Sequence, residues 1–157
     1  MCKCTNLGVV ADPLSDDALG AWRAFLTAYG RVTRRINRDL AEAGLPDLGW
    51  YDVLWALHEA PDRRLRMREL AERVVISRTG LVRLVDRIEA AGLARREAVP
   101  GDRRGAYVAV TDDGAALLRR MWPVYRRGVV EHFAAHLGAS PARVRRMLER
   151  VAESAGP

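Results

Sequence analysis

The stretch Leu70–Gly114, LAERVVISRTGLVRLVDRIEAAGLARREAVPGDRRGAYVAVTDDG, decides the fold of this 157-residue chain. A first pattern of apolar residues at helical spacing stops just before Ser77, which is a good N-cap for a second helix that ends at Gly92. Residues 93–99 and 106–110 follow as the two predicted strands of a hairpin. A helix, a short turn, a second helix and a hairpin, in this order, predict a winged helix-turn-helix.

The positive charge of the chain is concentrated in nearly the same segment. Residues 63–104 hold twelve arginines and six acidic residues and so carry the whole formal net charge of +6, while the remainder holds fourteen basic and fourteen acidic residues. A positive field focused on one segment favours a polyanionic partner. A solvated, arginine-rich surface is the alternative, and it explains the preference for arginine over lysine but not the clustering.

The helix that begins after Ser77 has two different faces. Its apolar residues share one face, and its polar and charged residues fall largely on the opposite face. The N-terminal end of a recognition helix enters the major groove, where arginine binds guanine bidentately and threonine contacts a thymine methyl group. We therefore expect DNA contacts from Ser77, Arg78, Thr79, Val82, Arg83 and Arg87. An ordinary amphipathic helix is the alternative, which the adjoining hairpin and the clustered charge disfavour.

The predicted hairpin carries Asp102, Arg103 and Arg104 at its tip, within the connection formed by residues 100–105. A hairpin tip beside a groove-bound helix reaches the flanking minor groove, whose negative potential attracts arginine at A·T-rich steps. Asp102 can pair with the guanidinium of Arg104 and fix its direction. Because Asp, Gly and Arg are also ordinary turn residues, a solvated turn explains the composition of the tip equally well.

Two helices and a brief strand precede this module. Ser15 is a good N-cap for a long helix whose apolar stripe runs from Trp22 to Leu40. A second, apolar helix is predicted over Leu48–Glu59, and a brief strand over Leu65–Met67. The first stripe is too long to be covered by the small winged module alone, so it needs a further partner.

Two more helices follow the hairpin. Thr111 is a good N-cap for a long helix with apolar residues at helical spacing from Leu117 to Leu137. Pro123 lies inside that pattern and is expected to kink the helix. Ser140-Pro141 predicts the cap and the first residue of a final helix.

Residues 70–114 resemble the central segment of the MarR family of bacterial transcriptional regulators. The family's run LVDRLEAAGLV is matched by residues 84–94, and its D-x-R wing signature by Asp102 and Arg104. The L-T-x-x-G pattern that follows the wing is matched by residues 110–114. The helix order outside this segment agrees with the family as well.

The departures from the family pattern are mild: Ala94 stands where valine is common, and Val110 stands in place of leucine. The resemblance implies that residues 77–83 make most of the base contacts. It also implies that Arg104 contacts the minor groove and that Asp102 orients it.

The resemblance further implies a homodimer in which the N- and C-terminal helices of two chains interlock, which gives both long apolar stripes a partner. We expect a flexible tail over residues 1–14, dimerisation helices over residues 15–47 and 111–157, and a DNA-binding domain over residues 48–110. A two-fold dimer contacts a pseudo-palindromic operator whose half-sites lie one helical turn apart, roughly 34 Å.

The resemblance also implies a small effector, bound between the dimerisation helices and the DNA-binding lobe. For this pocket we expect the residues Trp22, Arg23, Trp50, Tyr51, Trp55 and His58. The rings suit an aromatic ligand, and Arg23 or Arg31 can pair with the charge of an aromatic anion. Core packing is the alternative interpretation for each of these residues.

Two other residue pairs have the chemistry of a metal or redox site. His132 and His136 stand four apart, which places both on one side of a helix, but the pattern lacks a third zinc ligand. Cys2 and Cys4 lie in the leading tail and indicate neither a disulfide framework nor an oxidant sensor. We therefore expect no metal and no cofactor, and a reducing cytoplasm as the compartment.

The sequence contains no phosphate-binding glycine loop, nucleophile elbow or triad pattern, so an enzyme is not expected. The predicted fold is mainly α with a small β-hairpin wing (α+β). The predicted function is a dimeric, sequence-specific transcriptional regulator, more specifically a ligand-responsive repressor. A non-specific architectural DNA-binding protein and a metal- or redox-responsive regulator of the same fold are the alternatives.

Overall fold

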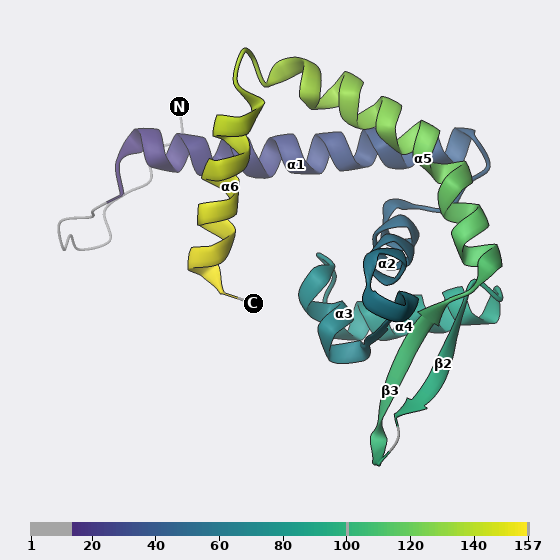
Figure 1. Cartoon of the computed structure of the whole chain (residues 1–157). Helices are drawn as coiled ribbons and strands as arrows, with labels where there is room; N and C mark the ends of the chain where they lie inside the picture. Colours follow the sequence, from purple (N-terminus) through teal and green to yellow (C-terminus); the bar gives the residue numbers. More distant parts are fainter. Residues whose placement is uncertain (1–13, 100, 157) are drawn as a thin grey trace.

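The computed structural model describes residues 14–99 and 101–156, and for residues 99 and 102–104 it describes the backbone alone. The predicted mainly α fold with a small β wing is confirmed (Figure 1). In chain order the elements are α1 (Asp16–Glu42), α2 (Leu48–Glu59), a 3-10 turn (Pro61–Arg63), β1 (Arg64–Arg66), α3 (Met67–Arg73), α4 (Arg78–Ala90), β2 (Ala94–Val99), β3 (Asp102–Val110), α5 (Asp112–His132), a second 3-10 turn (Ala134–His136) and α6 (Pro141–Ala155). Cys2 and Cys4, with the rest of the predicted tail before Leu14, lie outside the described residues.

Three of the predicted helix caps are confirmed. The hydroxyl oxygens of Ser15, Ser77 and Thr111 accept hydrogen bonds from the backbone N–H groups three residues later, at 3.1, 3.2 and 3.1 Å. Each satisfies a donor that the first turn of a helix otherwise leaves unpaired. Ser140 is the N-cap residue of α6 and Pro141 its first residue, as predicted, but the Ser140 side chain makes no capping hydrogen bond.

The sheet has three antiparallel strands in the order β1-β3-β2. The predicted brief strand pairs with β3, with Leu65 opposite Val108. It covers Arg64–Arg66 rather than Leu65–Met67, because Met67 already belongs to α3. The carboxylate of Glu69 accepts the Arg66 N–H at 2.9 Å, and this contact fixes the start of α3 at Met67.

The core lies inside the winged module, where α2, α4, the sheet and the adjoining parts of α1 and α5 meet. Its largest fully buried side chains are Leu40, Leu54, Leu57, Leu70, Leu81, Ile88, Met121, Val53, Val85 and Val108. At roughly 1.5–3 kcal/mol for each fully buried side chain of this size, their burial dominates the stability of the module.

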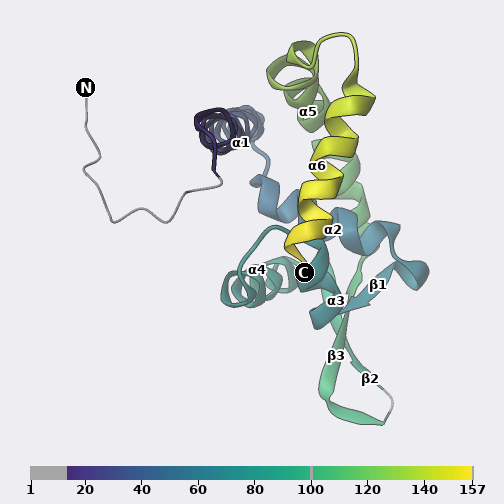
Figure 2. The same cartoon turned by 90° about the vertical axis from the view of Figure 1, so that its left-hand side faces the viewer.

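The long helices α1 and α5 lie side by side above the module (Figures 1 and 2). Of α1 only Ile36 and Leu40 are buried, so the N-terminal half of its apolar stripe is uncovered. Helix α6 buries none of its residues and runs from the far end of α5 back toward the module (Figure 2).

Helix α5 continues through Pro123 without interruption, and its axis changes direction along its course (Figure 1). The predicted extension of this helix to Leu137 is wrong, because Phe133 leaves the helical conformation at φ −132° and a 3-10 turn follows. No helix among the described residues is long and apolar enough to cross a membrane.

Candidate nucleic-acid interface and ligand cavity

Helix α4 presents the predicted DNA-contacting residues on one exposed face. Leu81, Leu84, Val85 and Ile88 are buried against the core and fix the orientation of the helix. The opposite side is open to solvent and carries Ser77, Arg78, Thr79, Val82, Arg83 and Arg87. The structure therefore brings all six predicted residues of this helix together.

The arginines of the basic segment differ in their partners. Among the described residues, Arg78 and Arg83 have no carboxylate partner, whereas the arginines at positions 63, 64, 68, 95 and 96 are held in ion pairs. The guanidinium of Arg87 lies 5.7 Å from the centre of the Trp50 ring, in a cation–π arrangement. Among the described residues, Arg78, Arg83 and Arg87 of α4 and Arg73 at the end of α3 are thus the arginines of this segment that no carboxylate offsets.

The wing is tied to α4 by ion pairs. Arg96 of β2 contacts Asp86 at 2.5 Å and also contacts Glu89, and its backbone N–H donates to Glu89 at 2.9 Å. Because two carboxylates of α4 hold one arginine of the hairpin, the orientation of the wing is coupled to that of the helix. The sequence does not distinguish Arg96 from the neighbouring arginines.

A second group of contacts stiffens the hairpin across its strands. Glu97 accepts from Arg64 of β1 at 2.9 Å and from Arg95 of its own strand at 2.8 Å. Arg64 and Arg66 both lie over the ring of Tyr107, at 4.8 and 5.5 Å from its centre. The partnership with Arg64 and Arg95 lowers the pKa of the Glu97 carboxyl.

The tip of the wing differs from the prediction. Residues 102–105 are part of β3, where the sequence predicted a connection over residues 100–105. Val99 pairs with Asp102 and Ala98 with Ala106, so that residues 103–105 form an insertion between paired positions of β3. The pairing of Val99 with Asp102 next to the turn extends β3 beyond the predicted limit. The side chains of Asp102, Arg103 and Arg104 lie outside the described residues.

Three of the six residues predicted for an effector pocket lie in one cluster of rings between α2 and α5. Tyr51 stacks on Tyr125 with 4.2 Å between ring centres, and Trp55 stacks on Trp122 at 6.0 Å. His58 lies beside Trp55 at 6.3 Å. The rings are packed against one another, as the core-packing alternative describes, and burial raises the pKa of Tyr51.

The other three residues are placed elsewhere. Trp22 and Arg23 lie in the exposed part of α1, and Trp50 lies under Arg87. Arg31 is exposed on α1 as well. The structure therefore does not gather the predicted ring set and its arginines around one space.

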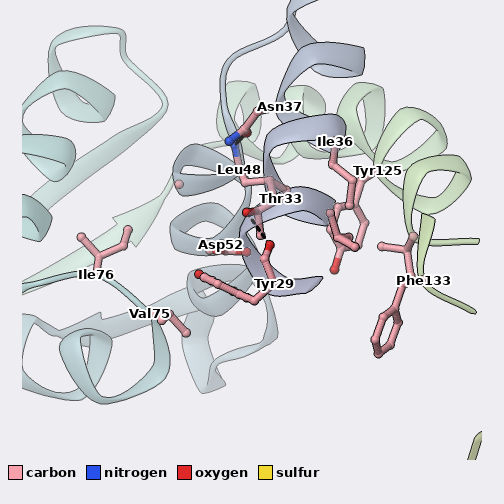
Figure 3. Close-up of a pocket in the computed structure, with 13 residues that line it drawn as sticks. Tyr29, Thr33, Ile36, Asn37, Leu48, Asp52, Val75, Ile76, Tyr125 and Phe133 are labelled. Carbon is pink, nitrogen blue, oxygen red and sulfur yellow. Dashed lines mark hydrogen bonds between the residues drawn. The ribbon is translucent and has the colours of Figure 1, made fainter. Parts of the chain in front are cut away.

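A cavity of about 510 Å³ does open between α1, α2, α5 and the segment before α4, lined by other residues (Figure 3). Its wall consists of Tyr29, Val32, Thr33, Ile36, Asn37, Leu48, Gly49, Asp52, Val75, Ile76, Tyr125, Val129 and Phe133. Figure 3 shows side chains of three helices, among them Tyr29, Asp52 and Tyr125, around this common space. The cavity lies where the long helices meet the winged module.

Asp52 is the one charged residue of the cavity wall. It is partly buried, and among the described residues it has neither a hydrogen-bond nor an ion-pair partner. Burial, followed by the nearby charge of Asp47, raises its pKa to about 6. A carboxylate kept in such surroundings destabilises the folded chain at neutral pH.

We expect Asp52→Asn to stabilise the fold at neutral pH. Because the folded pKa is raised, the stabilising effect of a protonated Asp52 is complete below the unfolded pKa and is lost as the pH rises through about 6. After allowance for solvent exposure, the free energy of unfolding of the variant should exceed that of the wild type by about 1–2 kcal/mol at pH 7.5 and by much less at pH 4.5. Urea unfolding at both pH values and at one fixed protein concentration measures this difference.

Glu59→Gln is the matched control, since it makes the same change at an exposed position of the same helix. It should alter the free energy of unfolding by less than about 0.5 kcal/mol. An equal gain for Asp52→Asn at both pH values would contradict the assignment to the carboxylate charge.

The histidine pair does not share one helix face, contrary to the prediction. His132 is the last residue of α5 and His136 the last of the following 3-10 turn, because the backbone leaves the helical conformation at Phe133. His132 instead contacts Asp39 of α1, with 3.3 Å between Nε2 and Oδ2, and Arg35 contacts the same carboxylate at 3.3 Å. Within the described part of the chain, no three His, Cys, Asp or Glu side chains are grouped to hold a metal.

The cavity residues Tyr29, Asn37, Asp52 and Tyr125 were not among those predicted from the sequence. The only local signal was Asp52 itself, the one acid in the apolar run Trp50–Leu57. Tyr29 and Tyr125 stand on helical apolar stripes and look like core residues until α1 and α5 are placed beside α2.

Helices α3 and α4 are followed by the hairpin of β2 and β3, which ion pairs join to α4, and one face of α4 is open to solvent. This arrangement defines a winged helix-turn-helix protein. A family model described as MarR family matches residues 43–105. The structure of Sco3205, a MarR family transcriptional regulator from Streptomyces coelicolor in complex with DNA, is 33% identical, covers 89% of this chain and 88% of that chain, and has a TM-score of 0.77. AbsC, a MarR family regulator from the same organism, is 30% identical over 92% and 96% of the two chains, with a TM-score of 0.76.

The HTH-type transcriptional regulator YkoM of Bacillus subtilis is 26% identical over 124 residues, which is 79% of this chain and 77% of that protein. This chain belongs to the MarR family. Its relatives are transcriptional regulators and not enzymes.

Proposed function

We propose that the protein is a homodimeric, sequence-specific repressor that releases its operator when a small ligand binds. The observation that carries the proposal is the exposed arginine pair of α4, Arg78 and Arg83, which no carboxylate of the described residues offsets and which lies on a helix joined to the wing by ion pairs. Non-specific electrostatic binding of DNA needs only positive charge. A recognition helix held in a fixed orientation to a wing suits the recognition of one DNA sequence.

Each α4 lies in a major groove in this proposal. Arg78 and Arg83 bind guanine edges, and Thr79 and Val82 supply hydroxyl and methyl contacts to the neighbouring bases. The Ser77 hydroxyl oxygen already accepts the Gly80 N–H, and its own proton is left to donate to a phosphate. Arg87, placed over Trp50, lies farther along the helix, where it suits a phosphate contact.

The wing contacts the minor groove that flanks each half-site. Arg104 enters the groove, Asp102 orients it, and Arg103 adds positive charge next to the phosphates. The contacts of Arg96 with Asp86 and Glu89 hold β2 against α4, which supports simultaneous engagement of the helix and the wing.

Two copies associate through residues 15–47 and 111–157, and residues 48–110 bind DNA. The long helices support this division, because they expose large apolar side chains that monomeric proteins rarely leave in contiguous patches. These are Trp22, Phe25, Leu26 and Tyr29 of α1, Trp122 and Val130 of α5, Phe133, and Met147 and Val151 of α6. A two-fold dimer then places two α4 helices on one face of the duplex.

The cavity between α1, α2 and α5 is the effector site in this proposal. It joins the helices that associate to the module that binds DNA, so a ligand seated there senses their relative position. A ligand shifts the population away from the DNA-binding form only by its difference in affinity for the two forms.

Selection of binding sites from a random duplex pool, at near-physiological salt, tests the proposal. An enriched inverted repeat with half-sites one helical turn apart is the expected result. Binding without an enriched motif, lost steeply as salt rises, would instead indicate a non-specific architectural protein. A motif that requires added zinc or an oxidant would indicate the metal- or redox-responsive alternative.

The wing assignment predicts a separate effect of Arg104→Ala. The variant should bind the selected operator about tenfold more weakly and lose the preference for A·T-rich flanks, since the minor-groove cation is removed. Arg103→Ala removes the same charge from the adjacent position and should weaken binding while the flank preference remains. Titration of operators with A·T-rich and G·C-rich flanks measures both, and an unchanged flank preference in Arg104→Ala would rule out the assignment.

A further inference from the structure

We propose that the cavity between α1, α2 and α5 binds a small organic cation with an aromatic or apolar body, and that the carboxylate of Asp52 is its counter-ion. This inference rests on the proposed function, in which the cavity is the effector site. It also replaces the aromatic anion that the sequence suggested with a ligand of the opposite charge.

The charge of the cavity wall decides the sign of the ligand. Of the thirteen lining residues one is acidic, Asp52, and none is an arginine, lysine or histidine. An anion would lose its hydration next to a carboxylate without gaining a cationic partner, which is strongly unfavourable. A cation would gain the ion pair that Asp52 otherwise lacks within the described residues.

The polar residues Asn37 and Thr33 of the cavity wall are neutral, and both already make hydrogen bonds within the protein. The side-chain oxygen of Asn37 accepts the Leu48 N–H at 2.8 Å, and the Thr33 hydroxyl donates to the Tyr29 carbonyl at 2.8 Å. The Asn37 contact joins α1 to the start of α2, and the Thr33 contact lies within α1. Asp52 is the one carboxylate of the wall, and both of its oxygens are left to accept from a ligand. Burial raises its pKa, but only to about 6, which is still below neutral pH.

The rest of the wall suits the body of an aromatic amine. Tyr29, Tyr125 and Phe133 supply rings, and Val32, Ile36 and Val129 supply aliphatic surface. Rings attract a cation through their faces and pack against an aromatic group as well. A volume of about 510 Å³ lies within the usual range of small-molecule sites and suits a ligand of one or two rings.

One arginine lies close enough to need a separate test. Arg73 lines an adjoining, smaller hollow that shares Asp52 and also includes Glu59. Arg73 forms no ion pair with Asp52 among the described residues, and it is not part of the main cavity wall. A ligand held in the adjoining hollow would depend on Glu59 as well as on Asp52, and this difference supplies the control variant.

The test compares three indole compounds that share a ring and differ in charge: tryptamine, which is a cation, the neutral tryptophol, and the anion indole-3-propionate. Calorimetric titration of the full-length protein at pH 7.5 should give at least a tenfold preference for tryptamine over indole-3-propionate. Asp52→Asn should weaken tryptamine binding tenfold or more, as expected for a charge-assisted contact, and leave tryptophol binding unchanged. Glu59→Gln should bind tryptamine like the wild type.

Three results would overturn the proposal: no binding of tryptamine at millimolar concentration, a preference for indole-3-propionate, or equal losses in Asp52→Asn and Glu59→Gln. The unfolding measurement on Asp52→Asn separates loss of the counter-ion from loss of the fold, because that variant should be more stable than the wild type at this pH.

The same compounds, added to the complex with the selected operator, separate this inference from the proposed function. Release by indole-3-propionate but not by tryptamine would keep the cavity as effector site and refute the cation. Tryptamine binding that depends on Asp52 but releases no DNA would keep the cation site and refute the ligand response.

Discussion

Replacing Arg83 with alanine should lower the affinity of the protein for its selected operator ten- to a hundredfold. Arg83 is exposed on the side of α4 that faces away from the core, and within the described residues no carboxylate neutralises it. A bidentate contact between arginine and guanine contributes about 1–3 kcal/mol of discrimination, so its loss should also relax the selection at one base pair of each half-site. Equilibrium titration of the operator and of its single-base variants measures both effects.

Two further variants define what Arg83 does. Arg83→Lys keeps the charge but not the planar fork, so it should recover the salt-dependent part of the affinity without the base preference. Arg119→Ala removes an exposed arginine of α5, outside the basic segment, and should leave the affinity within about twofold. Full recovery of affinity and preference by Arg83→Lys would show that the residue contacts only phosphate.

The parts of the fold that were predicted correctly depend on local signals. Ser15, Ser77 and Thr111 cap helices because a hydroxyl and the N–H three residues later are neighbours in sequence. The bounds of α2 follow similarly, since Asp47 caps its start through the Gly49 N–H and Pro61 follows its end. The exposed face of α4 follows from helical periodicity alone.

The parts that were not predicted depend on contacts between distant segments. The cavity forms only when α1, α2 and α5 converge, and no periodicity in one helix reveals which residues face the space between three. The start of β3 at Asp102 depends on pairing with β2 and on the shift in register near Ala98. The contact of His132 with Asp39 joins residues 93 positions apart and takes His132 away from the predicted partnership with His136.

The ion pairs of the basic segment separate two uses of arginine that composition cannot distinguish. Arg96 connects the wing to α4 through Asp86 and Glu89, and Arg64 connects β1 to β2 through Glu97. These arginines hold the wing, β1 and α4 together, whereas Arg78 and Arg83 have no carboxylate partner within the described residues and so remain available for the proposed contact with DNA. Part of the excess positive charge therefore lies on the exposed face of α4, where the proposed groove contact needs it.

The second large effect should come from Gly114→Ala, which we expect to destabilise the fold by about 3 kcal/mol. A Cβ at this position would overlap the carbonyl oxygen of Leu93 and lie 2.8 Å from Cγ2 of Val110. The Leu93 oxygen cannot move freely, because it accepts the Thr111 N–H at 3.1 Å and so connects the turn after α4 to the start of α5. Overpacking against such fixed backbone typically costs 1–3 kcal/mol and occasionally more.

The matched control is Gly20→Ala in α1, where a Cβ would meet no atom within 4 Å. There alanine should stabilise the helix by up to about 1 kcal/mol, since it has the higher helix propensity and restricts the unfolded chain. Urea unfolding at one fixed protein concentration should therefore shift in opposite directions for the two glycines. Gly114→Ala should also weaken operator binding, because its junction joins β3 of the wing to α5. A Gly114→Ala protein as stable as the wild type would show that the Leu93 backbone can shift to accommodate the Cβ, and that this junction does not hold the wing in place.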